Sequence, residues 1–219
     1  MTTDLMHDVH LKKLFLLFKT VSMKRICVFC GSSLGFPVIY REAAAELGKM
    51  LARKKIGLVY GGANVGIMKV LADTVLQFGG EVIGVMPQSL IDNEVAHKGL
   101  TEFHVVQSMA ERKDLMVSYS DAFIAFPGGF GTLDELSEIL TFNQLRITDK
   151  PIGFLNIAGY FDLLFGFIDH GVKEGFIREE HQQNLIVATD CESILSKLVD
   201  FVPVSVVKWL EDIKVESEF

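Results

Sequence analysis

The feature that most constrains the fold of this chain is an alternation between two kinds of segment, which runs from Lys24 almost to the C-terminus. Short apolar runs rich in β-branched residues are each followed by a turn, and then by a longer stretch with apolar residues at helical spacing. This alternation predicts consecutive strand–helix–strand units. We expect strands at Arg25–Cys30, Ile56–Tyr60, Glu81–Met86, Phe103–Val106, Ala122–Phe126, Ile152–Asn156 and Leu185–Ala188. We expect helices at about Val38–Lys54, Val65–Phe78, Ala110–Tyr119, Leu133–Leu145, Phe161–Glu174 and Glu192–Val199, with a last one near Ser205–Asp212.

Several of the expected strands are apolar throughout, as in Ala122–Phe126. Such runs are typical of a parallel sheet that is covered on both faces. The expected fold class is therefore α/β, with a doubly wound, mostly parallel, Rossmann-like sheet, helices on both faces, and a ligand beyond the carboxyl ends of the strands. With 219 residues, of which 49% are hydrophobic, the chain can bury one large core and form a single domain.

The expected domain occupies residues 23–202, between an N-terminal extension at 1–22 and a C-terminal helix or tail at 203–219. A strand begins directly after Met23, so two interpretations of the extension stay open. Either Met23 is the native start, or residues 1–22 form a short amphipathic helix on the surface or on a partner. The apolar run Leu14–Phe18 is too short for a membrane span and lacks the small-residue cleavage site of a signal peptide, so no membrane association is expected.

Charge and cysteine content narrow the functional classes. The formal net charge of −7 argues against a surface that binds nucleic acid, because such a surface needs a basic stripe. Cys27 and Cys30 lie at odd spacing in one predicted strand, which places them on opposite faces, and Cys191 is distant in sequence. A disulfide framework is therefore not expected, and a cytoplasmic location fits best. Neither a second cysteine pair nor clustered histidines complete a metal site, so no metal is expected.

Small residues follow three of the predicted strands. They are Gly31-Ser32-Ser33 after the first strand, Gly61-Gly62-Ala63-Asn64 after the second, and the loop Pro127–Thr132 after the fifth. Because ligands bind beyond the carboxyl ends of parallel strands, we expect all three segments to open onto one crevice. None forms the G-x-G-x-x-G fingerprint of dinucleotide sites or the G-x-x-x-x-G-K-[ST] of nucleoside triphosphatases. Taken singly, each glycine is equally well explained by a turn or by helix packing.

The third of these loops predicts a site for a phosphate. Gly128, Gly129 and Gly131 let the backbone turn sharply and bring N–H groups close to an anion, and the positive end of the following helix favours negative charge. Thr132 and Glu135 also fit an [ST]-x-x-[DE] capping box, which would make Glu135 structural. In the functional alternative, the helix dipole keeps Glu135 ionised, and its carboxylate activates water or stabilises a cationic transition state on the attached sugar.

A mixed charge run follows the fourth predicted strand, at Glu111–Asp114. Such a run is usually a solvated helix face. In the functional alternative, Arg112 points into the crevice, where its planar guanidinium forks to a carboxylate or phosphate in a way that a lysine such as Lys113 cannot. Met116 is expected in the core, and a place in the pocket wall is the weaker alternative.

The loop at 92–97 supplies two further candidates, Glu94 and His97, for the wall of a substrate pocket. A flexible polar loop is the default explanation of this segment.

At this point the motifs resemble a known family. Pro127–Glu135 matches the P-G-G-x-G-T-x-x-E signature of the Lonely guy family, and Arg112–Met116 resembles its R-K-x-x-M element. Further segments follow the family's pattern in the same order, namely Gly31-Ser32-Ser33, Val59-Tyr60-Gly61-Gly62, Gly66-Ile67-Met68, Gly84-Val85-Met86-Pro87, Glu94-Val95-Ala96-His97, Ser120-Asp121-Ala122-Phe123 and Glu174-Gly175-Phe176-Ile177. The resemblance covers nearly everything from Met23 to about Val202.

The resemblance implies a cytokinin riboside 5′-monophosphate phosphoribohydrolase, which cleaves the N-glycosidic bond of a nucleoside 5′-monophosphate to free base and ribose 5-phosphate. The family's catalytic arginine and glutamate carry over to Arg112 and Glu135. We expect the phosphate and nucleotide to be bound by Gly31, Ser32, Ser33, Gly61, Gly62, Gly128, Gly129, Gly131 and Thr132, with Glu94, Lys113 and Met116 as weaker pocket candidates. No cofactor is implied. Members have often been labelled lysine decarboxylases, but nothing in the sequence supports pyridoxal phosphate chemistry.

Some positions depart from the family's pattern and leave the preferred base open. Asp134 stands where a second Glu is common, Phe142 where Trp is common, and Lys69 and Arg146 where Gly is frequent. Two alternatives to cytokinin activation remain: a non-catalytic nucleotide or molybdopterin carrier, and a general purine or pyrimidine nucleotide nucleosidase.

The resemblance favours a homodimer, and larger assemblies stay open. The richly apolar segment Tyr160–Ile168 fits either a helix buried on two sides or a subunit contact.

Overall fold

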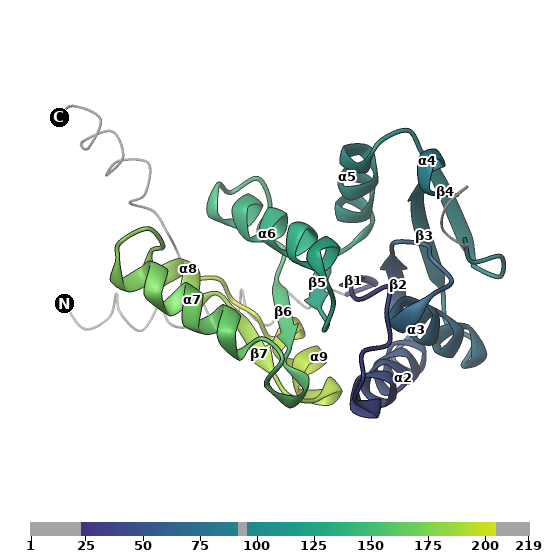
Figure 1. Cartoon of the computed structure of the whole chain (residues 1–219), viewed down its shortest axis with the longest axis horizontal. Coiled ribbons are helices and arrows are strands. Elements are labelled where there is room, and N and C mark those ends of the chain that lie inside the picture. Colours follow the sequence, from purple (N-terminus) through teal and green to yellow (C-terminus); the bar gives the residue numbers. More distant parts are fainter. Residues whose placement is uncertain (1–22, 92–95, 205–219) are drawn as a thin grey trace, which may run out of the picture.

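A seven-stranded parallel sheet forms the centre of the protein, in a computed structural model that describes residues 23–91 and 96–204 (Figure 1). The strand order is β4-β3-β2-β1-β5-β6-β7, and each neighbouring pair is parallel. The strands are β1 (Arg25–Phe29), β2 (Gly57–Tyr60), β3 (Val82–Pro87), β4 (Glu102–Val106), β5 (Ala122–Ala125), β6 (Ile152–Leu155) and β7 (Ile186–Ala188). Each agrees with its predicted strand to within one residue at either end. The predicted fold class is confirmed.

Helices pack on both faces of the sheet (Figure 1). One apolar core joins the sheet to α2 (Val38–Arg53), α3 (Gly66–Gln77) and α9 (Cys191–Val199), and the other joins it to α5 (Met109–Tyr119), α6 (Phe130–Gln144) and α7 (Asp162–Lys173). Apolar periodicity predicts all six, but α6 begins at Phe130 instead of Leu133. None of the helices in the described ranges is long and apolar enough to cross a membrane.

Three short helical segments were not predicted. They are α4 (Gln88–Ile91), the 3₁₀ turn η1 (Ile157–Gly159) and α8 (Glu179–Gln183). Each is too short to show a helical period in sequence. The helix expected near Ser205–Asp212 lies outside the described residues, as does the N-terminal extension.

Strand β1 shows how the apolar runs build two cores at once. Because successive side chains of a strand point to opposite faces, Ile26 and Val28 enter one core while Cys27 and Phe29 enter the other. Phe29 stacks on Phe123 of β5 with ring centroids 5.8 Å apart. Cys30 lies in the core opposite to that of Cys27, which confirms the predicted placement on opposite faces, and both thiols are free and buried.

The direction of winding reverses at β1. This strand pairs with β2 on one side and with β5 on the other. The chain first builds the sheet outward from β1 to β4, then returns to add β5, β6 and β7 on the other side of β1. At such a switch point the loops after the two neighbouring strands run to opposite faces, which leaves room for a ligand between them.

Candidate active site at the switch point

A crevice of about 180 Å³ lies where the sequence predicts one, beyond the carboxyl ends of β1, β2 and β5. Its lining consists of Val28, Cys30, Gly31, Ser32, Gly61, Met68, Leu90, Arg112, Gly129, Phe130, Gly131, Thr132 and Glu135. All three predicted loops therefore contribute to one site. Eight of the predicted site residues meet there, namely Gly31, Ser32, Gly61, Arg112, Gly129, Gly131, Thr132 and Glu135.

The charged groups of the crevice form one ion pair. Nη2 of Arg112 lies 3.3 Å from Oε1 of Glu135, and the two side chains are only 13% and 9% exposed. The guanidinium is also anchored from behind, because its Nε donates to the carbonyl of Val85 at 3.1 Å. Helices α5 and α6, which carry the two residues, pack on the same face of the sheet. The pair is therefore held in place by both helices and by β3, and both of its residues line the crevice.

Gly61 makes room for this guanidinium. A side-chain carbon built on Gly61 would overlap Nη2 of Arg112. Any other residue directly after β2 would therefore force the guanidinium to shift from its place beside Glu135. A second glycine, Gly62, has φ +80°, a conformation that side chains rarely adopt, and it packs closely against Phe103.

Burial raises the pKa of Glu135 to about 7, and this is the largest influence on the carboxyl group. The positive charge of Arg112 acts in the opposite direction and is the second influence. The expectation that the helix dipole keeps Glu135 ionised is therefore wrong. Because α6 begins at Phe130, Glu135 lies in the second turn, where the dipole acts weakly, and burial dominates.

The capping-box interpretation of Thr132 and Glu135 is also wrong. The residue that caps α6 is Gly129, and it has no side chain to contribute. Thr132 lies inside the first turn and is 3% exposed. Glu135 therefore does not cap α6, and its carboxylate pairs with Arg112.

The loop before α6 has the features of an anion site. The first N–H groups of any helix lack acceptors within the helix, and the helix dipole adds positive potential at this end. Gly128 packs so tightly against Thr132 and the Gly31 backbone that a side chain there would overlap both, whereas one on Gly129 or Gly131 would meet no atom within 4 Å. The loop is closed toward the protein and open toward the crevice.

Other predicted site residues lie outside the lining of the crevice. The backbone of Ser32 and Ser33 packs against Gly66 at the start of α3. Gly62 and Gly128 are absent from the lining, and each packs closely against neighbouring residues. Met116 is 1% exposed and lies in the core, as the first interpretation had it. Glu94 lies outside the described residues.

Lys113 is not part of the crevice lining, and it joins α5 to α6. Its Nζ lies 3.3 Å from Asp134 and 3.1 Å from Glu138. This lysine therefore contributes to the spacing of the two helices that carry Arg112 and Glu135.

Sequence reasoning missed several contributors. Cys30, Met68 and Leu90 line the crevice, and burial raises the pKa of the Cys30 thiol, which keeps it protonated. The position of Cys30 at the end of a predicted strand is the one signal that could have found it. Tyr160 was also missed as a site residue: its hydroxyl donates to the carbonyl of Gly128, and no local motif announces that contact.

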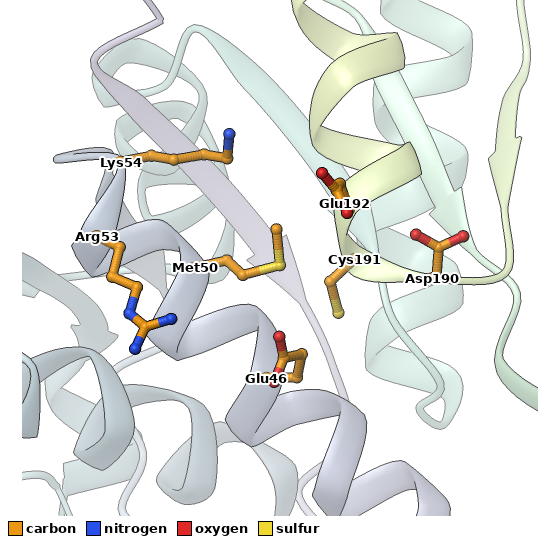
Figure 2. Close-up of a pocket in the computed structure, with 7 residues that line it drawn as sticks. All are labelled: Glu46, Met50, Arg53, Lys54, Asp190, Cys191 and Glu192. Carbon is orange, nitrogen blue, oxygen red and sulfur yellow. The ribbon is translucent and has the colours of Figure 1, made fainter.

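A larger hollow of about 510 Å³ lies between α2 and α9 (Figure 2). Its lining is Glu46, Met50, Arg53, Lys54, Asp190, Cys191 and Glu192. Burial raises the pKa of the Cys191 thiol to about 12, so this sulfur is protonated and unreactive at neutral pH. The lining is mostly charged residues of both signs, and it includes no glycine. We therefore place the candidate site at the smaller crevice.

Comparisons with known proteins identify the family of this chain. Fold and crevice together define a Rossmann-like protein with a glycine-rich loop at its switch point. Residues 68–198 match the family model described as "Possible lysine decarboxylase". The chain belongs to this family, which includes the Lonely guy phosphoribohydrolases.

Two plant relatives illustrate the sequence similarity. The chain is 48% identical over 181 residues to "Probable cytokinin riboside 5'-monophosphate phosphoribohydrolase LOGL9" of Oryza sativa subsp. japonica, which covers 83% of this chain and 80% of that protein. It is 47% identical over 180 residues to "Cytokinin riboside 5'-monophosphate phosphoribohydrolase LOG1" of Arabidopsis thaliana. This alignment covers 82% of this chain and 84% of that protein.

Solved structures with similar folds include proteins whose names refer to the molybdenum cofactor. The molybdenum cofactor binding protein of Rippkaea orientalis gives a TM-score of 0.63 at 23% identity, covering 81% of this chain and 96% of that one. The Moco carrier protein of Chlamydomonas reinhardtii gives a TM-score of 0.61 at 21% identity. The match covers 81% of this chain and 96% of that one. At these identities the likeness concerns the fold alone.

The pKa of Glu135 is open to direct measurement by ¹³C NMR titration of the side-chain carboxyl group. We expect a midpoint of about 7 in the unmodified protein, well above the ordinary 4.5. Arg112→Gln removes the charge that opposes the effect of burial, so the midpoint should move higher still. Lys197→Gln, on α9, is the control and should leave it in place. A midpoint near 4.5 in the unmodified protein would contradict burial as the dominant cause.

Gly61→Ala should raise the same midpoint without removing any charge. The added methyl group overlaps the guanidinium and displaces it, so Glu135 loses part of the influence that lowers its pKa. Gly131→Ala is the matched control, because its methyl group meets no atom within 4 Å and its position is helical. Equal midpoints in Gly61→Ala and the unmodified protein would show that Arg112 does not depend on the missing side chain.

Proposed function

We propose that this protein hydrolyses the N-glycosidic bond of a nucleoside 5′-monophosphate, a cytokinin riboside 5′-monophosphate or AMP, to free base and ribose 5-phosphate. The observation that carries the proposal is the buried Arg112–Glu135 pair, which faces an open glycine loop across one small crevice. The names of the relatives at 48% and 47% identity support the same reaction. We assign the activity to residues 23–202.

The loop is proposed to hold the 5′-phosphate. Backbone N–H groups between Gly128 and Thr132, with the Thr132 hydroxyl, supply donors at the positive end of α6. Gly31, Ser32 and Gly61 form the facing wall. Holding the phosphate away from the reacting bond fixes the ribose, so that its anomeric carbon faces Glu135.

Glu135 is proposed to act on the bond that breaks. Cleavage of the C1′–N bond sends its electron pair to the base and leaves an oxocarbenium-like sugar, whose positive charge the Glu135 carboxylate stabilises. A water directed by this carboxylate attacks C1′ and loses a proton, while the departing base gains one. With a pKa of about 7, Glu135 is populated in both protonation states at neutral pH, which suits it to accept the proton of the water.

Arg112 is proposed to act beside Glu135. Glycosidases ordinarily use two carboxylates, whereas here one carboxylate and one guanidinium serve. The arginine orients the Glu135 carboxylate and favours its ionised form. Its N–H groups at the crevice are also placed to assist the departing base.

The principal alternative is a non-catalytic carrier of a nucleotide or of molybdopterin, since carriers share the fold. A carrier needs the anion loop but has no use for a buried acid–base pair beside the sugar. The Arg112–Glu135 pair therefore supports the enzyme over the carrier.

A homodimer in the cytoplasm is the proposed form of the protein. On α7, Leu163 is 91% exposed and Phe167, one turn later, is 67% exposed. Large apolar side chains stacked on one helix face are typical of a surface that another protein covers, and we assign a second copy of this chain to it. The three cysteines, free and buried, agree with a reducing compartment.

Glu135→Gln should bind nucleotide but release ribose 5-phosphate at least ~100-fold more slowly, because an amide neither stabilises the cationic sugar nor accepts a proton. Release of free base is measured by chromatography, with AMP and its N6-isopentenyl analogue in competition to identify the preferred base. Glu138→Gln is the matched control, since Glu138 lies on the same helix outside the crevice lining. Unchanged turnover in Glu135→Gln, or no base release by the unmodified protein, would contradict the proposal.

Leu163→Glu should weaken the dimer about 100-fold or more, because it buries an unpaired carboxylate in the contact. Analytical ultracentrifugation over a range of concentrations measures this. Val199→Glu, at an exposed position on α9, is the control and should leave the dimer intact. Equal dissociation constants for Leu163→Glu and the unmodified protein would show that this face of α7 is not the dimer contact.

A further inference from the structure

The hydroxyl of Tyr160 reaches the anion loop from a distant part of the chain. It donates to the carbonyl of Gly128, thirty-two residues earlier in the sequence. Tyr160 follows η1, in which Ala158 and Gly159 have φ of 52° and 71°. This left-handed pair turns the chain sharply between β6 and α7 and brings Tyr160 to the loop after β5.

Ring contacts fix the position of Tyr160 independently of its hydroxyl. Its ring meets Tyr40 of α2 edge to face at 5.8 Å and Phe161 at 5.1 Å. Phe161, 2% exposed, belongs to the core. The hydroxyl is therefore presented to the loop by a ring that is 44% exposed and packs against two other aromatic rings.

The peptide that Tyr160 contacts is one that could otherwise rotate. It joins two glycines, Gly128 and Gly129, whose backbones accept both signs of φ. The described peptides are all trans, so the Gly129 N–H points opposite to the Gly128 carbonyl. With the carbonyl turned to Tyr160, this N–H is directed away from Tyr160. Rotation of the peptide would reverse the two groups and turn a carbonyl oxygen toward the space in which Gly129 lines the crevice.

We propose that Tyr160 is a positioning residue for anion binding, because its hydroxyl locks the Gly128–Gly129 peptide with the N–H toward the crevice. A carbonyl dipole facing a phosphate repels it, whereas an N–H group binds it. Tyr160 thus sets the sign of one dipole in the site without touching the ligand. The inference rests on the proposed binding of a 5′-phosphate by this loop.

Tyr160→Phe tests the lock, because it keeps the ring contacts and removes only the hydroxyl. The dissociation constant of ribose 5-phosphate, measured by calorimetry, should rise about 2- to 10-fold, as should KM for AMP, with kcat little changed. Cleavage of adenosine, which has no phosphate, should be unaffected, so the preference for AMP over adenosine should fall by the same factor.

Tyr40→Phe is the matched control. It removes a hydroxyl from the other ring of the same pair and should leave ribose 5-phosphate binding and both KM values unchanged. Thermal melts and sedimentation of both variants check the fold and the dimer.

Three results would overturn the assignment of Tyr160: unchanged binding of ribose 5-phosphate in Tyr160→Phe, equal losses with AMP and adenosine, or the same loss in Tyr40→Phe. The binding measurement separates this inference from the proposed reaction. If the unmodified protein cleaves no nucleotide but binds ribose 5-phosphate, and Tyr160→Phe weakens that binding, the reaction is wrong and the lock stands.

Discussion

The pairing of β1 with both β2 and β5 is the constraint on which the rest of the structure depends. Cys27 of β1 is in register with Val59 on one side and with Phe123 on the other. This double register brings three loops, distant in sequence, to one edge of the sheet within reach of each other. The loops are then joined directly, since the Gly31 N–H donates to the carbonyl of Pro127 at 3.2 Å, and the Ile67 N–H at the start of α3 donates to the carbonyl of Gly31 at 3.1 Å. The order of the strands therefore determines the place of the crevice, and the side chains determine its chemistry.

Within that frame, the chemistry depends on a balance between burial and charge. Removing a carboxyl group from water favours its neutral form, and a nearby guanidinium favours its ionised form. At Glu135 the first influence is the larger, but Arg112 keeps the carboxyl group within reach of ionisation at neutral pH. The balance requires the two helices to meet at a fixed separation, and it requires Gly61 to leave space for the guanidinium. The absence of a side chain in the loop after β2 is therefore linked to the protonation of an acid on a helix.

Most of the fold could be predicted from the sequence, because its signals are local. The apolar run of β5 and the helical spacing of α2 each indicate an element without reference to the rest of the chain. The start of α6 could not be predicted in this way. Phe130 and Gly131 continue a glycine-rich loop in composition, yet they form the first helical turn, and this shift removes the capping role that the sequence had offered for Glu135. The contact between Tyr160 and Gly128 was beyond prediction for a different reason, since it depends on where the chain returns after β6.

Lys113 and Asp134, the sequence neighbours of Arg112 and Glu135, form a second ion pair between the same two helices. The two pairs differ in their contact with solvent, because the Asp134 side chain is 58% exposed whereas that of Glu135 is 9% exposed. Dissolved salt screens charges in water and hardly affects charges removed from it. The outer pair therefore responds to the ionic strength of the surroundings, and the inner pair is shielded from it. A change in the salt content of the cell therefore acts mainly on the outer pair, whose charges also influence the pKa of Glu135.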